Sequence, residues 1–565
     1  MESTLKFEAP GPGPWEAEGA HFPRPVTRFA MEGFLRAFPK GFAEGTARYG
    51  LLLSHLKPAC VNGFLYHQPV IFGAPEGAAG PPPKPVLWLL TRLVPKMRAR
   101  IETCRLAFEN KQWRADLAHW DNVDKPAAIE KHLALQAVDP APLTDPELIE
   151  HLGRAQAHQE EMVGLHHRYT ITCTIATGDY VAHVGAWTQA SAGIALELLR
   201  GTSPISKGIA ADELDALAEA IRADATARAA LTGTDAQAVL DLLSEGVGAV
   251  GKCARAYLGI VRFRSVGYDL CDKNCGEMPE LLLKAIRVAV DGGSAETALL
   301  GRDAKEQALR ARVPAEHRAR FDELLTEARL INRLRDERAV YSDGWGTGLA
   351  RRALLAAGER LVKRDRLGAA EHAVDLSLLE LSALLAGEAG PSSSEVEQRV
   401  HWRMTKTVAD IPAWLNSPPS PPPPASIFPA PARRAANAVD AVLNNLFKDS
   451  ERTNAARVLH GISVNSGTYE GTARLVLDGA DFEKIKQGDI LVTRATSPYF
   501  NVVLPLLGAL VTDRGGQLCH AAIVAREYGI PGIVGTKDAT RTIPDGARIR
   551  VDGSTGEVTL LSQPS

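Results

Sequence analysis

Residues 512–532 read TDRGGQLCHAAIVAREYGIPG. The apolar run Leu510–Thr512, which leads into them, has the character of a strand. The glycine pair at 515–516 then lets the backbone turn tightly and approach a ligand, because no Cβ is in the way. Residues 521–528 favour a helix, and Gly529 stands where a helix C′ residue belongs. The pattern predicts a strand, a tight glycine turn and a short helix.

This pattern places His520 in the first turn of the predicted helix. The backbone N–H groups there have no partner within the helix, and the helix dipole is positive, so the position favours an anion. A histidine in such a place has the chemistry to attack phosphorus and to hold the phosphoryl group. The alternative is a core histidine in an ordinary strand–turn–helix.

The neighbourhood of His520 favours the first interpretation. It resembles the phosphohistidine signature of the mobile, swivelling domain of phosphoenolpyruvate-utilising enzymes, a family that includes phosphoenolpyruvate synthase, pyruvate phosphate dikinase, rifampicin phosphotransferase and phenylphosphate synthase. The matching residues are Gly515, Gly516, His520, Ala521, Ala522, Val524, Ala525, Arg526, Gly529, Pro531 and Gly535. Upstream, Gly488–Val492 and Thr496-Ser497-Pro498 fit the same pattern.

The resemblance implies roles for the residues of this signature. His520 is the implied nucleophile and forms a covalent phosphohistidine, while Gly515, Gly516, Cys519 and Arg526 form its loop. Cys519 departs from the pattern, because relatives usually carry Ser or Thr beside the histidine. A cysteine keeps the small side chain and a weak donor, so we expect His520 to work, with altered tuning.

Length and charge limit the classes of protein. A chain of 565 residues holds about two to four domains, and 64 basic against 67 acidic residues indicate neither a nucleic-acid nor a membrane surface. The N-terminus lacks the regions of a signal peptide, and no run of roughly 20 apolar residues is present. We therefore expect a soluble, cytoplasmic protein. The seven cysteines are expected to be reduced, and the lone pair Cys271/Cys275 predicts no zinc site.

The predicted fold class is α+β. We predict an irregular N-terminal segment (1–80) packed on a large, mainly helical acceptor-binding domain (81–390), then a Pro-rich linker with a hinge helix (391–457), and a small C-terminal β/β/α swivelling phosphohistidine domain (458–565). Residues 418–424 read PPSPPPP, a semi-rigid linker composition. The strands expected in the last domain are 472–477, 489–493, 509–512, 548–551 and 558–561. Parts of residues 1–80, 262–282 and 371–385 also look like the acceptor domain of the rifampicin-phosphotransferase and phenylphosphate-synthase group.

Four charged residues are candidates for binding phosphate or acceptor. Arg262 and Arg264 lie in the segment similar to the acceptor domain, where guanidinium forks can clamp a phosphoryl group. The alternative is an ion pair with Asp269 or Asp272. Arg335 and Asp336 lie at a charged helix end, which is usually just solvated.

An acceptor hydroxyl also needs a general base, and histidine is the usual choice. His166, His167 and His183 are candidates that the sequence does not separate. The first two belong to a histidine-bearing helix that a capping box at Thr144 and Glu147 predicts. Metal ligation by that helix lacks a supporting motif, so we predict no metal ligands in this chain.

The chain shows neither a glycine-rich phosphate loop ahead of its helical region nor a further domain after the phosphohistidine region. We therefore expect a separate ATP-grasp subunit as donor. This layout resembles phenylphosphate synthase, and also rifampicin phosphotransferase without its ATP-grasp domain. The resemblance implies that ATP gives AMP and phosphate, that the β-phosphoryl group passes through His520 to a small hydrophobic, phenol-like hydroxyl, and that Mg²⁺ and ATP bind chiefly to the partner.

Other functions stay open at this stage. The chain fits a phosphocarrier or regulatory protein that passes phosphate to another protein, a rifampicin-type or phosphoenolpyruvate-synthase-like transferase with another acceptor, or an inactive binding relative. A deep apolar pocket in the helical region would favour an enzyme, and a flat exposed apolar patch would favour a carrier.

Overall fold

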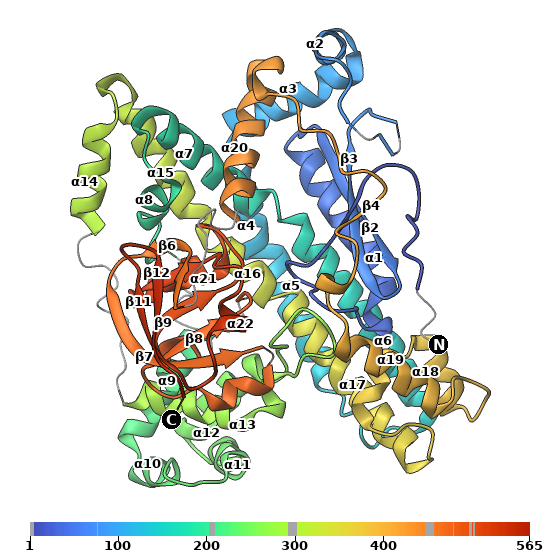
Figure 1. Cartoon of the computed structure of the whole chain (residues 1–565). Coiled ribbons are helices and arrows are strands. Elements are labelled where there is room, and N and C mark those ends of the chain that lie inside the picture. The colour runs from blue at the N-terminus through green and yellow to red at the C-terminus, as the bar shows by residue number, and fades with distance from the viewer. Residues whose placement is uncertain are drawn as a thin grey trace. The chain divides into compact units, whose positions relative to one another are not determined.

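The computed structural model describes residues 5–75, 77–78, 80–202, 210–291, 302–446, 457–477, 479–496, 500 and 503–564 (Figure 1). The chain forms two compact units, and each is made of three segments that are distant in sequence. Unit 1 comprises 1–173, 268–272 and 341–437, and unit 2 comprises 174–267, 273–340 and 438–565. The mainly helical α+β class is as predicted. The units do not follow the four consecutive segments expected from the sequence. All seven cysteines are free thiols.

The first 80 residues are not irregular. They contain β1 (Trp15–Ala17), α1 (Arg28–Arg48) and the hairpin of β2 (Leu53–Val61) and β3 (Phe64–Ile71). Asn62 and Gly63 close the hairpin with φ values of 53° and 87°, as an Asn-Gly turn requires. The prediction failed because proline and aromatic residues hid the helical period of α1, which contains Pro39.

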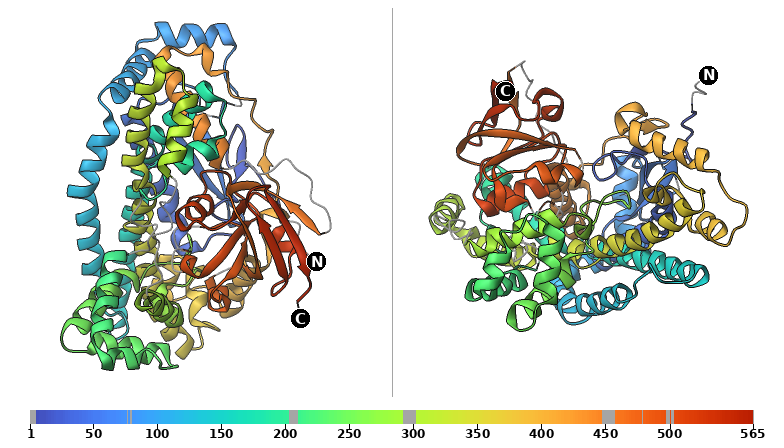
Figure 2. Two further views of the ribbon diagram at one scale, coloured as in Figure 1. Left: turned by 90° about the vertical axis from the view of Figure 1, so that its left-hand side faces the viewer. Right: turned by 90° about the horizontal axis from the view of Figure 1, so that it is seen from below.

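The other helices of unit 1 follow as a continuous series and then as a second group after residue 341. The first group is α2 (Lys84–Leu93), α3 (Pro95–Glu109), α4 (Gln112–His119), η1 (Trp120–Asp124), α5 (Lys125–Gln136) and α6 (Asp145–Arg168). The second group is α17 (Asp343–Lys363), η6 (Ala370–Asp375), α18 (Leu378–Leu385), α19 (Ser393–Thr405), η7 (Val408–Asp410) and η8 (Ala425–Ile427). Figure 2 shows α2, α3 and α4 in blue, one after another along an edge of this unit. The capping box at Thr144 and Glu147 is present, as predicted.

The predicted linker is only partly a linker. Residues 393–405 form α19, and β4 (Trp414–Leu415) pairs with β1 to complete a sheet of order β2-β3-β1-β4. The chain therefore returns to the N-terminal sheet after almost 400 residues, which no local pattern predicts. Residues 418–424 have neither helix nor strand, and α20 (Ala430–Leu446) follows where a hinge helix was expected.

The helices of unit 2 come from the middle of the chain. They are α7 (Thr172–Thr188), α8 (Ala192–Glu197), α9 (Ala211–Ala223), α10 (Ala225–Ala230), α11 (Ala236–Glu245), α12 (Ala249–Val261), η3 (Cys275–Glu277), α13 (Pro279–Val290), α14 (Arg302–Arg312), η5 (Ala315–His317), α15 (Arg318–Asn332) and α16 (Leu334–Val340). Tyr180, Phe321 and Leu518 share one buried apolar cluster, so helices and C-terminal residues have a common core in this unit.

The C-terminal part of unit 2 is built on a sheet whose described strands have the order β5-β12-β11-β7-β8-β9-β10-β6. The strands are β5 (Val458–His460), β6 (Ile462–Asn465), β7 (Thr468–Val476), β8 (Asp489–Thr493), β9 (Leu507–Thr512), β10 (Gly532–Val534), β11 (Arg548–Asp552) and β12 (Glu557–Ser562). The strands β7 to β10 are parallel and the other pairs are antiparallel. The remaining described elements here are η9 (Gly479–Lys484), η11 (Leu504–Leu506), α21 (His520–Tyr528) and α22 (Ala539–Thr542). All five predicted strands are present.

Candidate functional site

The glycine turn after β9 is sterically required. Gly515 has φ +115°, and a Cβ there would lie 2.7 Å from the sulfur of Cys519. A Cβ on Gly516 would lie 2.3 Å from the carbonyl oxygen of Asn445. The first glycine is needed for its backbone conformation and the second for its close approach to α20.

The C-terminal end of α20 holds this turn. The backbone N–H of Gly516 donates to the carbonyl of Leu446 (3.1 Å), and that of Leu518 donates to the carbonyl of Asn445 (2.7 Å). Helix ends have carbonyls without partners inside the helix, so the loop satisfies groups that α20 leaves open. The side chain of Leu518 is buried. The loop that leads to His520 is therefore anchored to the helical part of unit 2.

His520 is the first residue of α21, with Cys519 as its N-cap. Its ring is buried, with 7% exposure, and its Nδ1 lies 3.0 Å from the hydroxyl oxygen of Thr496. Burial, and after it the positive charge of Arg335, lowers the pKa of His520 to about 3. The imidazole is therefore neutral at physiological pH, which is the form that acts as a nucleophile.

Arg526 braces the loop from within α21. Its guanidinium donates to the backbone carbonyl of Gln517 (2.7 Å) and to the side-chain oxygen of the same residue. Gln517 in turn donates to the carbonyl of Ser463 in β6 (2.7 Å). Burial lowers the pKa of Arg526 to about 10, so it stays charged at neutral pH. The predicted loop residue Arg526 thus contacts the loop backbone.

The positive charges of Arg335 and Arg526 act on Cys519. Burial raises the pKa of its thiol, against opposing effects from backbone N–H groups of Ala522 and Ala521 and from the charges of Arg335 and Arg526. The side chain is therefore a neutral thiol beside His520. It keeps the small size of Ser or Thr and adds no charge.

Arg335 is the candidate arginine whose charge acts on both His520 and Cys519. It lies in α16, far from His520 in sequence. Its neighbour Asp336 is buried, and burial raises the pKa of that carboxyl to about 6. The charge of Arg335, one of the candidates for binding phosphate, therefore acts on the predicted site.

Arg262 and Arg264 are not placed as the predicted joint clamp. Arg264 is buried, and its Nε donates to the carbonyl of Ile260 (2.7 Å). Arg262 is exposed, and its guanidinium carbon lies 5.8 Å from the ring centre of Phe263. One of the two side chains is buried and the other is exposed, so they do not share a surface at which both could contact one phosphoryl group. The alternative partner Asp269 instead accepts from the backbone N–H of Thr27 (2.9 Å).

The three candidate bases lie in different surroundings. His166 and His167 are in α6 of unit 1, and Nδ1 of His166 lies 2.9 Å from a carboxylate oxygen of Asp343. The ring of His167 packs edge-on against Phe38, with centroids 4.5 Å apart. His183 is in α7 of unit 2, and its Nδ1 lies 2.8 Å from the carbonyl of Asp179.

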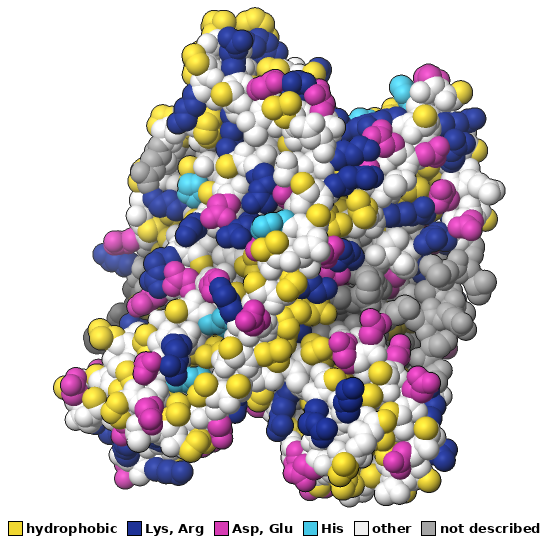
Figure 3. Space-filling view, turned by 180° about the vertical axis from the view of Figure 1, so that it is seen from behind, with side chains coloured by type: hydrophobic (Ala, Val, Ile, Leu, Met, Phe, Trp, Pro, Cys, Tyr) yellow, Lys and Arg dark blue, Asp and Glu magenta, His cyan; other side chains and the backbone are white. Residues whose placement is uncertain are grey.

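Among the described residues, no group of three His, Cys, Asp or Glu side chains is arranged to hold a metal ion. Over the same residues, helices with the length and apolarity for a membrane crossing are absent. Figure 3 shows charged side chains of both signs interspersed over one face.

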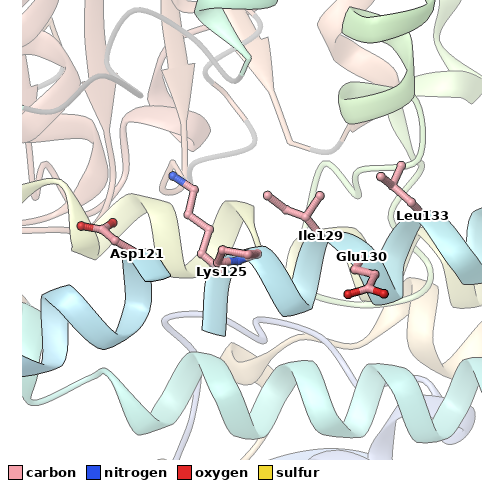
Figure 4. A pocket seen from close by; sticks show the side chains of 6 residues that line it. Asp121, Lys125, Ile129, Glu130 and Leu133 are labelled. Carbon is pink, nitrogen blue, oxygen red and sulfur yellow. The ribbon is translucent and has the colours of Figure 1, made fainter. Parts of the chain in front are cut away.

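An open hollow of about 500 Å³ lies beside α5 in unit 1 (Figure 4). Its lining residues are Asp121, Lys125, Pro126, Ile129, Glu130 and Leu133. Three of them are charged and all come from one stretch of chain. This hollow is therefore not the deep apolar pocket that would indicate a small-molecule acceptor site.

Sequence comparison agrees with the geometry around His520. Residues 485–556 match the family described as PEP-utilising enzyme, mobile domain. An uncharacterized phosphotransferase, YvkC, of Bacillus subtilis is 30% identical over 232 residues, which are 41% of this chain and 26% of that protein. Rifampicin phosphotransferase of a Streptomyces species is 49% identical over 104 residues, 18% of this chain and 12% of that protein. A probable phosphoenolpyruvate synthase of Archaeoglobus fulgidus is 40% identical over 109 residues, 19% of this chain and 14% of that protein.

These matches cover about a quarter or less of each relative's own length. They support phosphoryl transfer in general and not a particular acceptor. Sequence reasoning assigned no role to Thr496, Gln517 and Asn445, which hold His520 and its loop. The sequence signal for Thr496 was present, since it lies in the second segment that fits the mobile-domain pattern.

Proposed function

We propose that this chain is the phosphohistidine and acceptor subunit of a phosphotransferase, because residues 485–556 match the mobile domain of PEP-utilising enzymes. A nucleotide-binding ATP-grasp partner donates the phosphoryl group, and a small hydrophobic, phenol-like hydroxyl accepts it. The observation that carries the proposal is the state of His520, which is neutral, placed at a helix N-terminus and close to the charge of Arg335.

In the first step His520 receives the phosphoryl group. With its proton on Nδ1, the imidazole donates to the hydroxyl of Thr496, and the lone pair of Nε2 attacks phosphorus. The N–P bond forms as the P–O bond to the leaving group breaks. Overall, ATP, water and His520 give AMP, phosphate and phosphohistidine, with the β-phosphoryl group retained on the ring. Mg²⁺, held mainly by the partner, would neutralise phosphate charge.

In the second step the group moves to the acceptor. A general base takes the proton of the acceptor hydroxyl as its oxygen attacks phosphorus and the P–N bond breaks. The N-terminal end of α21 and the guanidinium of Arg335 stabilise the negative oxygens of the group in transfer. Aryl phosphate leaves and neutral His520 is restored.

Transfer of radiolabel tests the proposal. ATP labelled at the β- or the γ-phosphate is incubated with the chain, with and without candidate ATP-grasp proteins. The variants are His520→Ala and, as a control in the same β domain, His460→Ala. We expect acid-labile label from the β-position only, present in His460→Ala and absent in His520→Ala. Label from the γ-position, or label that survives in His520→Ala, would overturn the proposal.

The second candidate is a phosphocarrier that passes the group to another protein. The hollow beside α5 is open and is lined by a single stretch of chain, which suits a protein contact better than a small ligand. Chasing labelled chain with a panel of phenols, and with rifampicin as a separate acceptor, distinguishes the candidates. Release of label as an aryl phosphate supports the enzyme, whereas label retained against every small hydroxyl supports the carrier.

A further inference from the structure

Unit 1 contains a row of half-buried aromatic rings that ends at the histidines of α6. Phe34 and Phe38 lie one turn apart on α1, with centroids 5.2 Å apart and planes at 10°. His167 presents its ring edge-on to both, at 4.5 Å from Phe38 and 6.3 Å from Phe34. Phe22 extends the row, with its centroid 5.4 Å from that of Phe34. These rings are partly accessible and so are available to a further ring.

The row is held on a rigid support. A Cβ on Gly41 would lie 2.2 Å from the carbonyl oxygen of Gly164, so α1 and α6 pack at close range at this point. Phe22 and Phe34 also pack on a small buried cluster of Val26, Met31 and Leu65. Because these side chains are already held in place, they lose little conformational entropy when a ligand binds.

The charged neighbours of the row pair with one another. Arg36 of α1 bonds to Glu160 of α6 at 2.7 Å, and Arg168 of α6 bonds to Glu44 of α1 at 2.8 Å. These pairs tie the same two helices together. The row therefore offers aromatic faces and edges, with imidazole as its polar group, which suits an aromatic ring carrying a hydroxyl.

His166 is next to His167, with ring centroids 4.7 Å apart, and has the features of a positioned base. Its Nδ1 lies 2.9 Å from the carboxylate of Asp343. A carboxylate in that position keeps the proton on Nδ1, places the basic lone pair on Nε2 and stabilises the imidazolium that forms. Among the other two candidate bases, His183 has the carboxylate of Asp179 at 3.2 Å from its Nδ1.

We propose that Phe34, Phe38 and His167 bind the aromatic ring of the acceptor and that His166 is the base for its hydroxyl. The acceptor class rests on the proposed function. The O–H bond of the acceptor breaks, its proton passes to Nε2 of His166, and its electron pair stays on the oxygen as the phenolate. Asp343 is a positioning residue that acts through His166.

Binding of 4-nitrophenol to the full-length chain, without nucleotide, tests the site. Its phenolate absorbs visible light, so one titration reports both affinity and ionisation. We expect saturable binding that weakens about tenfold or more in Phe38→Ala and partly recovers in Phe38→Leu. The control Phe72→Ala removes another half-buried phenylalanine of unit 1, which contacts Lys96 and Arg100, and is expected to bind as wild type.

Ionisation of the bound phenol tests the base. In the wild type the bound phenol should ionise at lower pH than free phenol, because His166 accepts its proton. His166→Gln should abolish this shift while changing affinity for neutral phenol less than about threefold, and Asp343→Asn should reduce it. Thermal melts show which variants fold.

Equal binding by folded Phe38→Ala and wild type, or no saturable binding at all, would overturn the ring site. An unchanged ionisation shift in His166→Gln would overturn the base. Neither measurement involves phosphorylation, so they stand apart from the label test. Label on His520 without phenol binding removes only this inference, and phenol binding without label removes only the proposed function.

Discussion

His520 illustrates how burial selects a protonation state. The ring is closed off from water, and the largest cause of its lowered pKa, about 3 against the ordinary 6.5, is burial. Arg335 adds to the effect and would also attract a phosphoryl group once it is attached. The same charge thus keeps the nucleophile neutral before transfer and favours the phosphorylated state after it.

The first prediction concerns pH and stability. Between pH 6.5 and about 3 the unfolded chain binds a proton at this position and the folded chain does not. The free energy of unfolding therefore falls as pH falls through this window. Between pH 7.5 and pH 5, the loss should be about 2 kcal/mol greater for wild type than for His520→Gln. Urea unfolding at both pH values measures this difference, and equal losses in the two proteins would refute it.

The second prediction concerns the tautomer of His520. Thr496→Val keeps the shape of the side chain and removes the hydroxyl that lies 3.0 Å from Nδ1. The rate of labelling of His520 should fall roughly tenfold or more, because the ring loses the group that fixes its proton. Thr496→Ser keeps the hydroxyl and should recover most of the rate. Equal rates in the valine and serine variants would show that the contact has no role.

The third prediction concerns Arg335. Arg335→Ala removes the charge that acts on His520 and should slow phosphoryl transfer by roughly 100-fold. Arg335→Lys keeps a charge and should retain part of the rate. The measurement is single-turnover labelling. Because the same change raises the pKa of His520, rates are compared well above pH 7, where the ring is neutral in every variant.

At the scale of elements, the loop 513–519 joins β9 to α21 and is held by carbonyls at the end of α20. This contact explains why a glycine stands at position 516.

Gly516→Ala forces a Cβ to within 2.3 Å of the Asn445 carbonyl and should lower the free energy of unfolding by about 1–3 kcal/mol. The matched control is Gly185→Ala in α7, where a Cβ meets nothing within 4 Å. Because alanine has a higher helix propensity than glycine, this change should raise the free energy of unfolding by roughly 0.5–1 kcal/mol. Urea unfolding compares them, and a neutral Gly516→Ala would contradict the close contact.

At the scale of the whole molecule, the two units have separate hydrophobic cores. Leu354 is fully buried in the core around α6 and α17 of unit 1, and Ile490 in the core of the sheet of unit 2. We expect two transitions in calorimetry. Leu354→Ala should shift one transition to lower temperature and Ile490→Ala the other. Each change should reduce the free energy of unfolding of its own unit by about 2–5 kcal/mol. A single transition that both changes lower equally would show that the units unfold together.

The sequence by itself determined the local chemistry of the C-terminal part. Glycines 515 and 516, the helix after them and the stop at Gly529 are readable because their signals lie within one short stretch. The predicted strands are present for the same reason, since alternation and turn residues act over a few positions. The capping box that opens α6 is a further local signal that the structure contains.

Only the tertiary structure decided which distant residues meet. Thr496 and Arg335 come to His520 from other elements, β4 joins a sheet that begins near residue 15, and Arg264 turns inward, away from the expected clamp. Each of these depends on the packing of segments far apart in the chain, which has no local signature. The nucleophile His520 could be predicted from its neighbours in sequence. The hydroxyl of Thr496 beside its ring, the charge of Arg335 and the carbonyls of α20 that hold its loop follow only from burial and contact in three dimensions.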